Sequence, residues 1–218
     1  MRTRRALTVL EVMIAGTILA LVIVLALGLL RDTSEGVGDS LRMGDTAQRA
    51  NGMVLDLYRE LRPAGQFLLA GTALSPGGNF TNISYRPITG FDFAATAPAF
   101  GRLRQIRFVY DAGEAGGGNG DNLDNDRDGL IDEGRLELLE DRNDDGNPTN
   151  DGVLAVLALD VLGGNAISFA FVPSGTATPD LAQDREITVQ FTIARRLPAQ
   201  GQIHREPRTV RIGLRNSP

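Results

Sequence analysis

The chain of 218 residues contains no cysteine, which excludes a disulfide framework and any thiolate metal site. This absence is compatible with export, because a domain of this length can bury a core that needs no disulfide. Lysine is absent as well: all 22 basic residues are arginines, and their scatter along the sequence indicates a bias of composition rather than a function. The length predicts one domain, with room for an appendage.

Histidine occurs only once, as His204. We expect it in a hairpin loop, where a surface histidine is commoner than a general base. The glycine run Gly116–Gly118 precedes acidic residues rather than a helix that opens with lysine, which excludes a phosphate loop. Clustered carboxylates can flank a glycosidic bond, but their alternate spacing within one loop favours a metal. No pattern of a catalytic triad is present, and the sequence predicts that the protein is not an enzyme.

The net charge of −5 is spread unevenly along the chain. Residues 111–152 hold fourteen acidic residues and three arginines, a local net charge of −11, so the remainder carries +6. A compact acidic insert on a mildly basic body indicates cation binding rather than nucleic-acid binding.

Near the N-terminus, residues 7–30 form a long apolar segment whose only interruptions are Thr8, Glu11, Gly16, Thr17 and Gly28. As a helix the segment spans about 36 Å, enough to cross a bilayer. The arginines that precede it predict a cytoplasmic N-terminus and an extracytoplasmic remainder. A signal peptide would have a shorter apolar stretch followed by a small-x-small cleavage site. A plain anchor leaves Glu11 unexplained, because a carboxylate deep in a membrane costs roughly 2.5–3.5 kcal/mol and usually has a partner.

The residues Ala6-Leu7-Thr8-Val9-Leu10-Glu11 resemble the processing site of type IV prepilins. The resemblance implies that a prepilin peptidase cleaves between Ala6 and Leu7 and methylates the new amino terminus. It also implies that Glu11, with Thr8 in the same motif, serves assembly by meeting the N-terminal amine of a neighbouring subunit. A desolvated carboxylate gains most from an ammonium that is equally short of water. The family prefers Gly where this chain has Ala6 and Phe where it has Leu7.

Beyond the membrane segment, apolar residues recur at three- and four-residue spacing up to Pro63, which predicts an amphipathic continuation of the helix; they are Met43, Ala47, Ala50, Val54, Leu57 and Leu61. We therefore predict one helix from about Leu7 to Arg62, bent near its glycines.

The rest of the chain alternates apolar and polar residues between turn residues, which predicts an antiparallel meander with one buried face. The expected strands contain Asn82–Arg86, Ile106 to Tyr110, Leu136–Leu139, Val153–Leu159, Ile167 to Phe171, Ile187 to Ile193, and Val210 to Leu214.

These elements predict the α+β class and, through the resemblance, the type IV pilin fold. In that fold a long N-terminal helix, transmembrane in its first half, packs on an antiparallel β-sheet, here with an acidic loop insert. The expected division is a leader at 1–6, a transmembrane and filament-core helix at 7–30, its amphipathic continuation at 31–62, and a β-rich extracytoplasmic domain at 63–218 with the insert at 111–152.

The order of these features is similar to that of PilW-type minor pilins, with the turn Leu61-Arg62-Pro63-Ala64-Gly65 after the helix and Leu214-Arg215-Asn216 at the end. This resemblance implies a minor pilin that initiates or caps a type IV pilus. The J-type minor pseudopilin of type II secretion is the alternative, and a membrane-anchored calcium-binding adhesion module is the alternative from another class. The implied partners are other major and minor pilins, the prepilin peptidase, the inner-membrane assembly platform, a tip adhesin, and the membrane before assembly.

The acidic insert contains two loops with carboxylates at alternate positions, the spacing of the front half of an EF-hand loop. In the first, Asp124, Asp126 and Asp128 are expected to offer side-chain oxygens and Leu130 its carbonyl, with Asp132 or Glu133 closing the shell; Arg135 stands where the template has Glu. The second loop, with Asp141, Asn143 and Asp145, forms a second site or completes the first. The alternative is a solvated acidic loop that binds nothing.

Many oxygens on a flexible loop favour calcium over magnesium, with weak binding of roughly 10⁻⁴ M in calcium-rich surroundings. The expected role of the ion is structural, because the insert cannot bury a core of its own.

Overall fold

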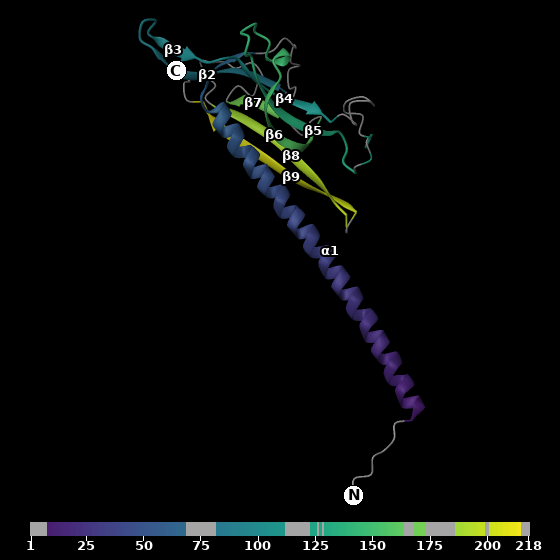
Figure 1. Ribbon diagram of the computed structural model, residues 1–218. Helices are drawn as coiled ribbons and strands as arrows, with labels where there is room; N and C mark the ends of the chain where they lie inside the picture. Colours follow the sequence, from purple (N-terminus) through teal and green to yellow (C-terminus); the bar gives the residue numbers. More distant parts are fainter. Residues whose placement is uncertain are drawn as a thin grey trace.

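Helix α1 (Val9–Leu61) is the longest element of the computed structural model, which describes residues 8–68, 82–111, 123–125, 127, 129–163, 168–172, 186–198 and 201–214. It begins at Thr8, whose side chain caps the first turn, and it ends two residues before Pro63, which has no N–H to continue the helix. Figure 1 shows α1 as one continuous ribbon without a sharp kink, where the sequence predicted a bend near the glycines. Glycine weakens a helix by about 1 kcal/mol but keeps its backbone hydrogen bond, so no kink is required.

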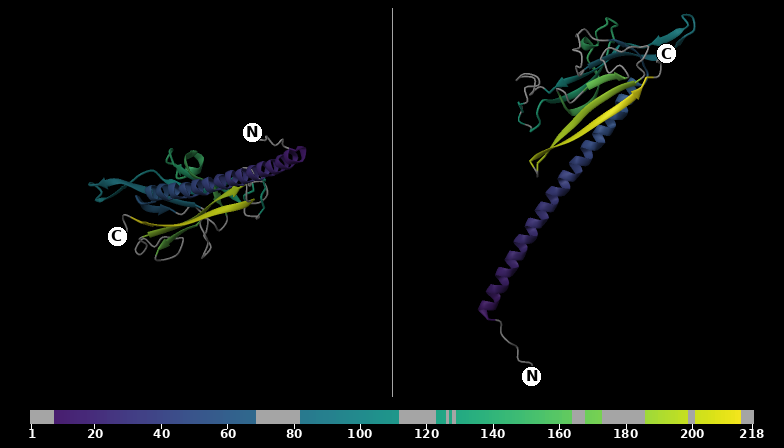
Figure 2. Two further views of the ribbon diagram at one scale, coloured as in Figure 1. Left: turned by 90° about the horizontal axis from the view of Figure 1, so that it is seen from below. Right: turned by 180° about the vertical axis from the view of Figure 1, so that it is seen from behind.

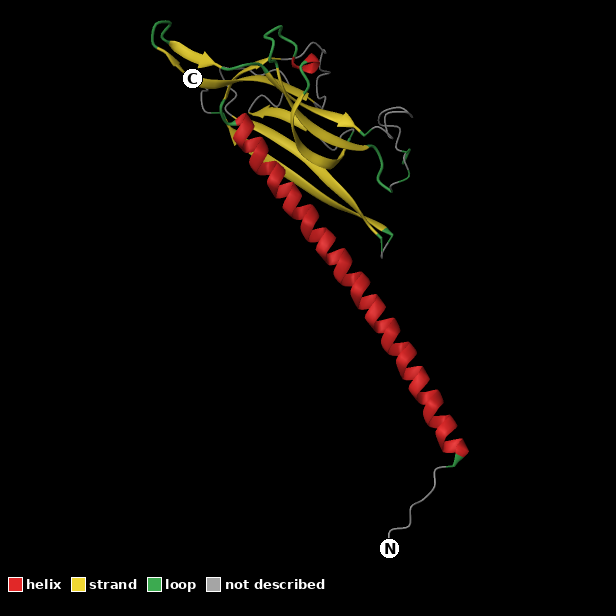
Figure 3. Ribbon diagram, viewed as in Figure 1, coloured by secondary structure: helices red, strands yellow, loops and turns green. Residues whose placement is uncertain are grey.

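Within the described residues, nine strands form one antiparallel sheet beside the C-terminal part of α1 (Figure 3). They are β1 (Ala64–Leu68), β2 (Asn82–Asp92), β3 (Ala97–Phe100), β4 (Arg104–Tyr110), β5 (Glu133–Glu140), β6 (Val153–Leu162), β7 (Ser168–Val172), β8 (Glu186–Leu197) and β9 (Gln202–Gly213). A short 3₁₀ turn, η2 (Pro148–Asn150), lies between β5 and β6. The predicted α+β class is confirmed, and the arrangement is consistent with the pilin fold.

The strand order is β1-β2-β4-β5-β6-β8-β7, with β3 paired to β2 and β9 paired to β8. The first part is the expected meander, but the second is not, because β8 lies between β6 and β7 and also carries β9. The join between β6 and β8 is narrow: its register is the single pair Val161 and Ile193. Helix α1, which packs on β6, β8 and β9, spans this narrow join between the two halves of the sheet.

The strand predictions hold where alternation is strong. Ile187, Val189, Phe191 and Ile193 are all buried on one face of β8. His204 lies within β9 opposite Arg195, so its expected place in a loop is wrong. Ile167 and the side chain of Phe171 lie outside the described residues.

The core lies between the sheet and one face of α1. Ala50, Met53, Leu57 and Leu61 are each at most 1% exposed, and burying one side chain of this size stabilises the fold by about 1.5–3 kcal/mol. The first buried residue along α1 is Asp39, so the N-terminal part of the helix projects from the body without packing on it (Figure 2).

Ion pairs fix the end of α1 to the sheet. Arg104 of β4 binds Glu60 of α1 at 2.9 Å and Glu140 of β5 at 2.8 Å. The hydroxyl of Tyr85 donates to Glu60 at 3.0 Å. Burial raises the pKa of Tyr85 far above its ordinary value, and the Glu60 charge raises it further. The group joins one helix and three strands, and so sets the position of the helix on the sheet.

Candidate functional site

Residues 9–30 of α1, which project from the body, have apolar side chains on every face. The large apolar side chains from Val9 to Leu30 are 49–78% exposed. By length and composition α1 is the one helix among the described residues able to cross a membrane. Apolar area of this size does not stay in water, so the segment is covered by lipid or by other apolar chains.

Glu11 is the one acidic residue in this apolar segment, and its own chain gives it two hydrogen bonds. The Thr8 backbone N–H donates to Glu11 Oε2 at 2.9 Å, and the Thr8 hydroxyl donates to the same oxygen at 3.0 Å. In return the Glu11 N–H donates to the Thr8 hydroxyl oxygen at 3.3 Å. This is a capping box, which the sequence analysis missed although the Thr-x-x-Glu spacing is its signature.

Because of the capping box, part of the Glu11 carboxylate already has a partner within its own chain. Glu11 is not a carboxylate without any partner, because Oε2 is occupied by Thr8. Its Oε1 makes no hydrogen bond to any residue in the described ranges, so one oxygen is still available to an ammonium. The processing residues Ala6 and Leu7 lie outside the described residues.

The first acidic loop closes through its first aspartate. Asp124 Oδ2 accepts a hydrogen bond from the backbone N–H of Gly129 at 3.1 Å. Gly129 has φ +97°, a left-handed conformation that favours glycine, and Arg127 is left-handed as well. Asp126 and Asp128 lie outside the described residues.

The second acidic loop repeats this geometry. Asp141 Oδ2 accepts from the N–H of Gly146 at 2.8 Å, and Gly146 has φ +84°. Asp144 takes the left-handed conformation that Arg127 has in the first loop. Hydrogen bonds from Asn150, Asn147 and Asn143 hold the pKa of Asp145 below its ordinary value, although slight desolvation opposes them. The similarity between the two loops that the sequence predicts therefore includes their backbone conformations.

The other residues expected as ligands, Leu130, Asp132 and Glu133, follow the first loop along the chain. Leu130 and Asp132 are buried, and Glu133, which is 2% exposed, is already the first residue of β5. Asp124 Oδ1 is enclosed and accepts no hydrogen bond from any described residue. Within the described ranges no three acidic or histidine side chains converge on one point. In the described part of each loop an aspartate lies beside a left-handed turn, without a complete set of metal ligands.

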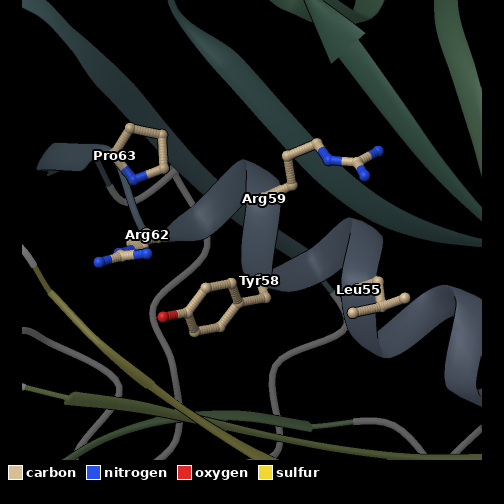
Figure 4. A pocket seen from close by; sticks show the side chains of 5 residues that line it. All are labelled: Leu55, Tyr58, Arg59, Arg62 and Pro63. Atoms are coloured by element: carbon tan, nitrogen blue, oxygen red, sulfur yellow. The ribbon is translucent and has the colours of Figure 1, made fainter.

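Two exposed surfaces lie at the end of the molecule far from the apolar segment. The ribbon of β2 and β3 projects beyond the sheet (Figure 1) and exposes Phe91, Phe93 and Phe100 by 42–88%. On α1, a hollow of about 530 Å³ is lined by Leu55, Tyr58, Arg59, Arg62 and Pro63. Figure 4 shows Tyr58 and Arg59 pointing to opposite sides of the helix. The lining of this hollow includes no acid, histidine or nucleophile in the described part of the chain, so its chemistry suits contact rather than catalysis.

No known family model matches the chain, and neither does any curated protein or solved structure. The structure itself shows one apolar N-terminal helix, with Thr8 and Glu11 forming a capping box at its start, beside an antiparallel sheet.

Proposed function

We propose that the protein is a subunit of a type IV pilin-like filament, most similar to a minor pilin that initiates or caps a type IV pilus. The observation that supports this best is the projecting segment 9–30 of α1, which is apolar on all faces apart from one carboxylate in its first turn. A subunit of this shape inserts in the inner membrane with its N-terminus in the cytoplasm. It then exchanges lipid for the helices of other pilins when it enters the filament.

Glu11 separates this proposal from a plain membrane anchor. An anchor needs the apolar helix and the Thr8 cap but no external partner for Glu11. A filament subunit uses the open Oε1 for the amino terminus of a neighbour, created by cleavage between Ala6 and Leu7. Charge-assisted hydrogen bonds of this kind are about twice as strong as neutral ones.

Two measurements test the proposal. Mass spectrometry of the protein from its native membrane is expected to find a mature N-terminus at Leu7, with a methyl group on the amine. Glu11→Ala and Glu11→Gln are both expected to abolish co-purification with other pilins. Glu11→Gln keeps the capping geometry and removes only the charge. An uncut N-terminus, or a Glu11→Gln protein that still assembles, leaves only the anchor.

A minor pseudopilin of type II secretion is the second candidate, because it would use the same helix and the same Glu11 contact. Co-purification of the full chain from its native membrane separates the two: pilus subunits identify the first, and secretion-system pseudopilins the second. A calcium-binding adhesion module that never polymerises would show neither.

The acidic loops support a structural calcium site as a second property. The enclosed Asp124 Oδ1 and the matching turns at Gly129 and Gly146 are what a cation-binding loop provides. Titration of calcium into the full chain in detergent is expected to raise the melting temperature, and Asp126→Ala to remove most of the shift. Asp32→Asn, on the exposed side of α1, is the matched control. No shift in the unmodified protein removes the calcium site.

A further inference from the structure

Asp39 is a buried carboxylate on α1 that has no hydrogen-bond or ion-pair partner among the described residues. The residue is 3% exposed, and its Oδ2 is enclosed without a hydrogen bond. Neither oxygen makes an ion pair or a hydrogen bond with a described residue. Buried charges in folded proteins are normally paired, because removing an ion from water is costly unless a counter-ion replaces the water. Glu137, which is equally buried, shows the usual solution, since two arginines bind it.

The carboxylate faces a cavity where α1 leaves the sheet. The cavity has a volume of about 260 Å³ and is lined by Glu35, Gly38, Asp39, Arg42 and Pro198. Pro198 directly follows β8, so the cavity is at the end of the body nearest the projecting half of α1. In the proposed filament, a neighbouring subunit that packs along the projecting part of α1 would reach this end of the body.

The charged residues that line the cavity are Glu35, Asp39 and Arg42. Glu35 is already bound by Arg31 at 2.9 Å. Arg42 is exposed and forms no ion pair within the described ranges. Asp39 is therefore the wall carboxylate that makes no ion pair with a described residue, although Arg42 lines the same cavity.

The wall suits a basic side chain better than a metal ion. Calcium takes six to eight oxygen ligands, whereas the described wall offers two carboxylates, of which Glu35 is already bound by Arg31. An arginine or lysine side chain needs only one carboxylate face, and its apolar stem fills the rest of a cavity of this size.

We propose that Asp39 receives an arginine or lysine side chain of a neighbouring subunit in the assembled filament. This inference rests on the proposed function, because only assembly brings a neighbour to the cavity. The isolated subunit then carries an unbalanced buried charge that assembly neutralises, which favours the assembled state over the free one. Residues that lower the stability of a single subunit are typical of sites that act in a complex.

Asp39→Asn in the full chain provides the test. In detergent, without other subunits, the variant is expected to melt at a higher temperature than the unmodified protein, since the unbalanced charge is gone. In the native membrane its co-purification with other pilins is expected to fall by about tenfold or more, as happens when one partner of a buried charge pair is removed. Asp39→Glu keeps the charge and is expected to restore co-purification. Asp39→Ala is the second variant, with the same expected pattern as Asn.

Several outcomes overturn the inference. If Asp39→Asn and Asp39→Ala both melt lower than the unmodified chain, the carboxylate is already satisfied within the subunit. If they co-purify normally while Glu11→Ala does not, the filament stands and Asp39 plays no part in it. If Glu11→Ala also co-purifies normally, the proposed function fails and takes this inference with it. If the calcium-induced rise in melting temperature disappears in Asp39→Asn but not in Asp32→Asn, a metal rather than a side chain occupies the cavity.

Discussion

Glu137 joins two strands of the sheet at the root of the acidic insert, and its loss has a calculable cost. The residue is 2% exposed, and its Oε2 accepts hydrogen bonds from Arg107 at 2.9 and 3.1 Å. Its Oε1 accepts from Arg135 at 2.7 Å. Glu137→Gln keeps the shape of the side chain but removes the charge that both guanidinium groups face.

Removing one member of a buried ion pair typically costs about 3–5 kcal/mol. Here the side chains of Arg107 and Arg135 are 31% and 36% exposed, so water can hydrate the two guanidinium groups and replace part of the lost interaction. We therefore expect Glu137→Gln to lower the free energy of unfolding by about 2–3 kcal/mol. For a chain of this size that corresponds to a fall of about 4–12 °C in melting temperature.

The same interaction makes the effect depend on pH. Burial by itself would raise the pKa of Glu137, but hydrogen bonds from Arg135 and Arg107 outweigh it and hold the pKa below the ordinary value of 4.5. A group with a lowered pKa stabilises the folded state above its unfolded pKa and loses that contribution as the pH falls through its folded pKa. The difference between the unmodified protein and Glu137→Gln is therefore constant near neutral pH and shrinks below about pH 4.5.

The assay is thermal unfolding of the full chain in detergent, followed by circular dichroism at neutral pH and at a series of acidic values. Asp56→Asn is the matched control, because its pair with Arg59 is exposed and contributes less than about 0.5 kcal/mol. Equal melting temperatures for Glu137→Gln and the unmodified chain at neutral pH would falsify this reasoning. A difference that stays constant into strong acid would show that packing, and not charge, explains it.

Three further substitutions are checked by the same thermal assay. Leu57→Ala empties a fully buried site between α1 and the sheet and is expected to cost about 2–5 kcal/mol; a smaller change would mean that the helix packs loosely. Tyr85→Phe removes the hydrogen bond to Glu60 and is expected to lower the free energy of unfolding by about 1 kcal/mol. Because burial and Glu60 raise the pKa of Tyr85, its contribution is present below about pH 10 and lost above it, so Tyr85→Phe is less sensitive to alkali. Phe93→Ser, at a side chain 88% exposed, is expected to change stability by less than about 0.5 kcal/mol, and a larger loss would show that the ribbon packs on the body.

Local patterns in the sequence predicted much of the fold. The apolar segment and the spacing from Met43 to Leu61 predicted one helix within two residues of its observed start and one of its observed end. The alternation from Ile187 to Ile193 predicted a strand with one buried face. These features are set by residues close together in the chain, through hydrogen bonds and side-chain periods that the sequence itself displays.

Two features of the site are visible in the spacing of residues along the sequence. The capping box needed only the spacing of Thr8 and Glu11. The burial of Asp39 follows from its position four residues before Met43, which places it on the apolar face of the helix. Both cases lie on a helix, where spacing alone decides which residues share a face.

The sequence by itself determined the helix, most of the strands, and the pair of acidic loops with matching turns. Only the tertiary structure decided that β8 lies between β6 and β7, that Glu137 is bound by Arg107 thirty positions away, and that no described residue pairs with the buried carboxylate of Asp39. Strand order and charge pairing depend on contacts between distant segments. Those contacts form when the whole chain buries its core, and no local pattern of residues encodes them.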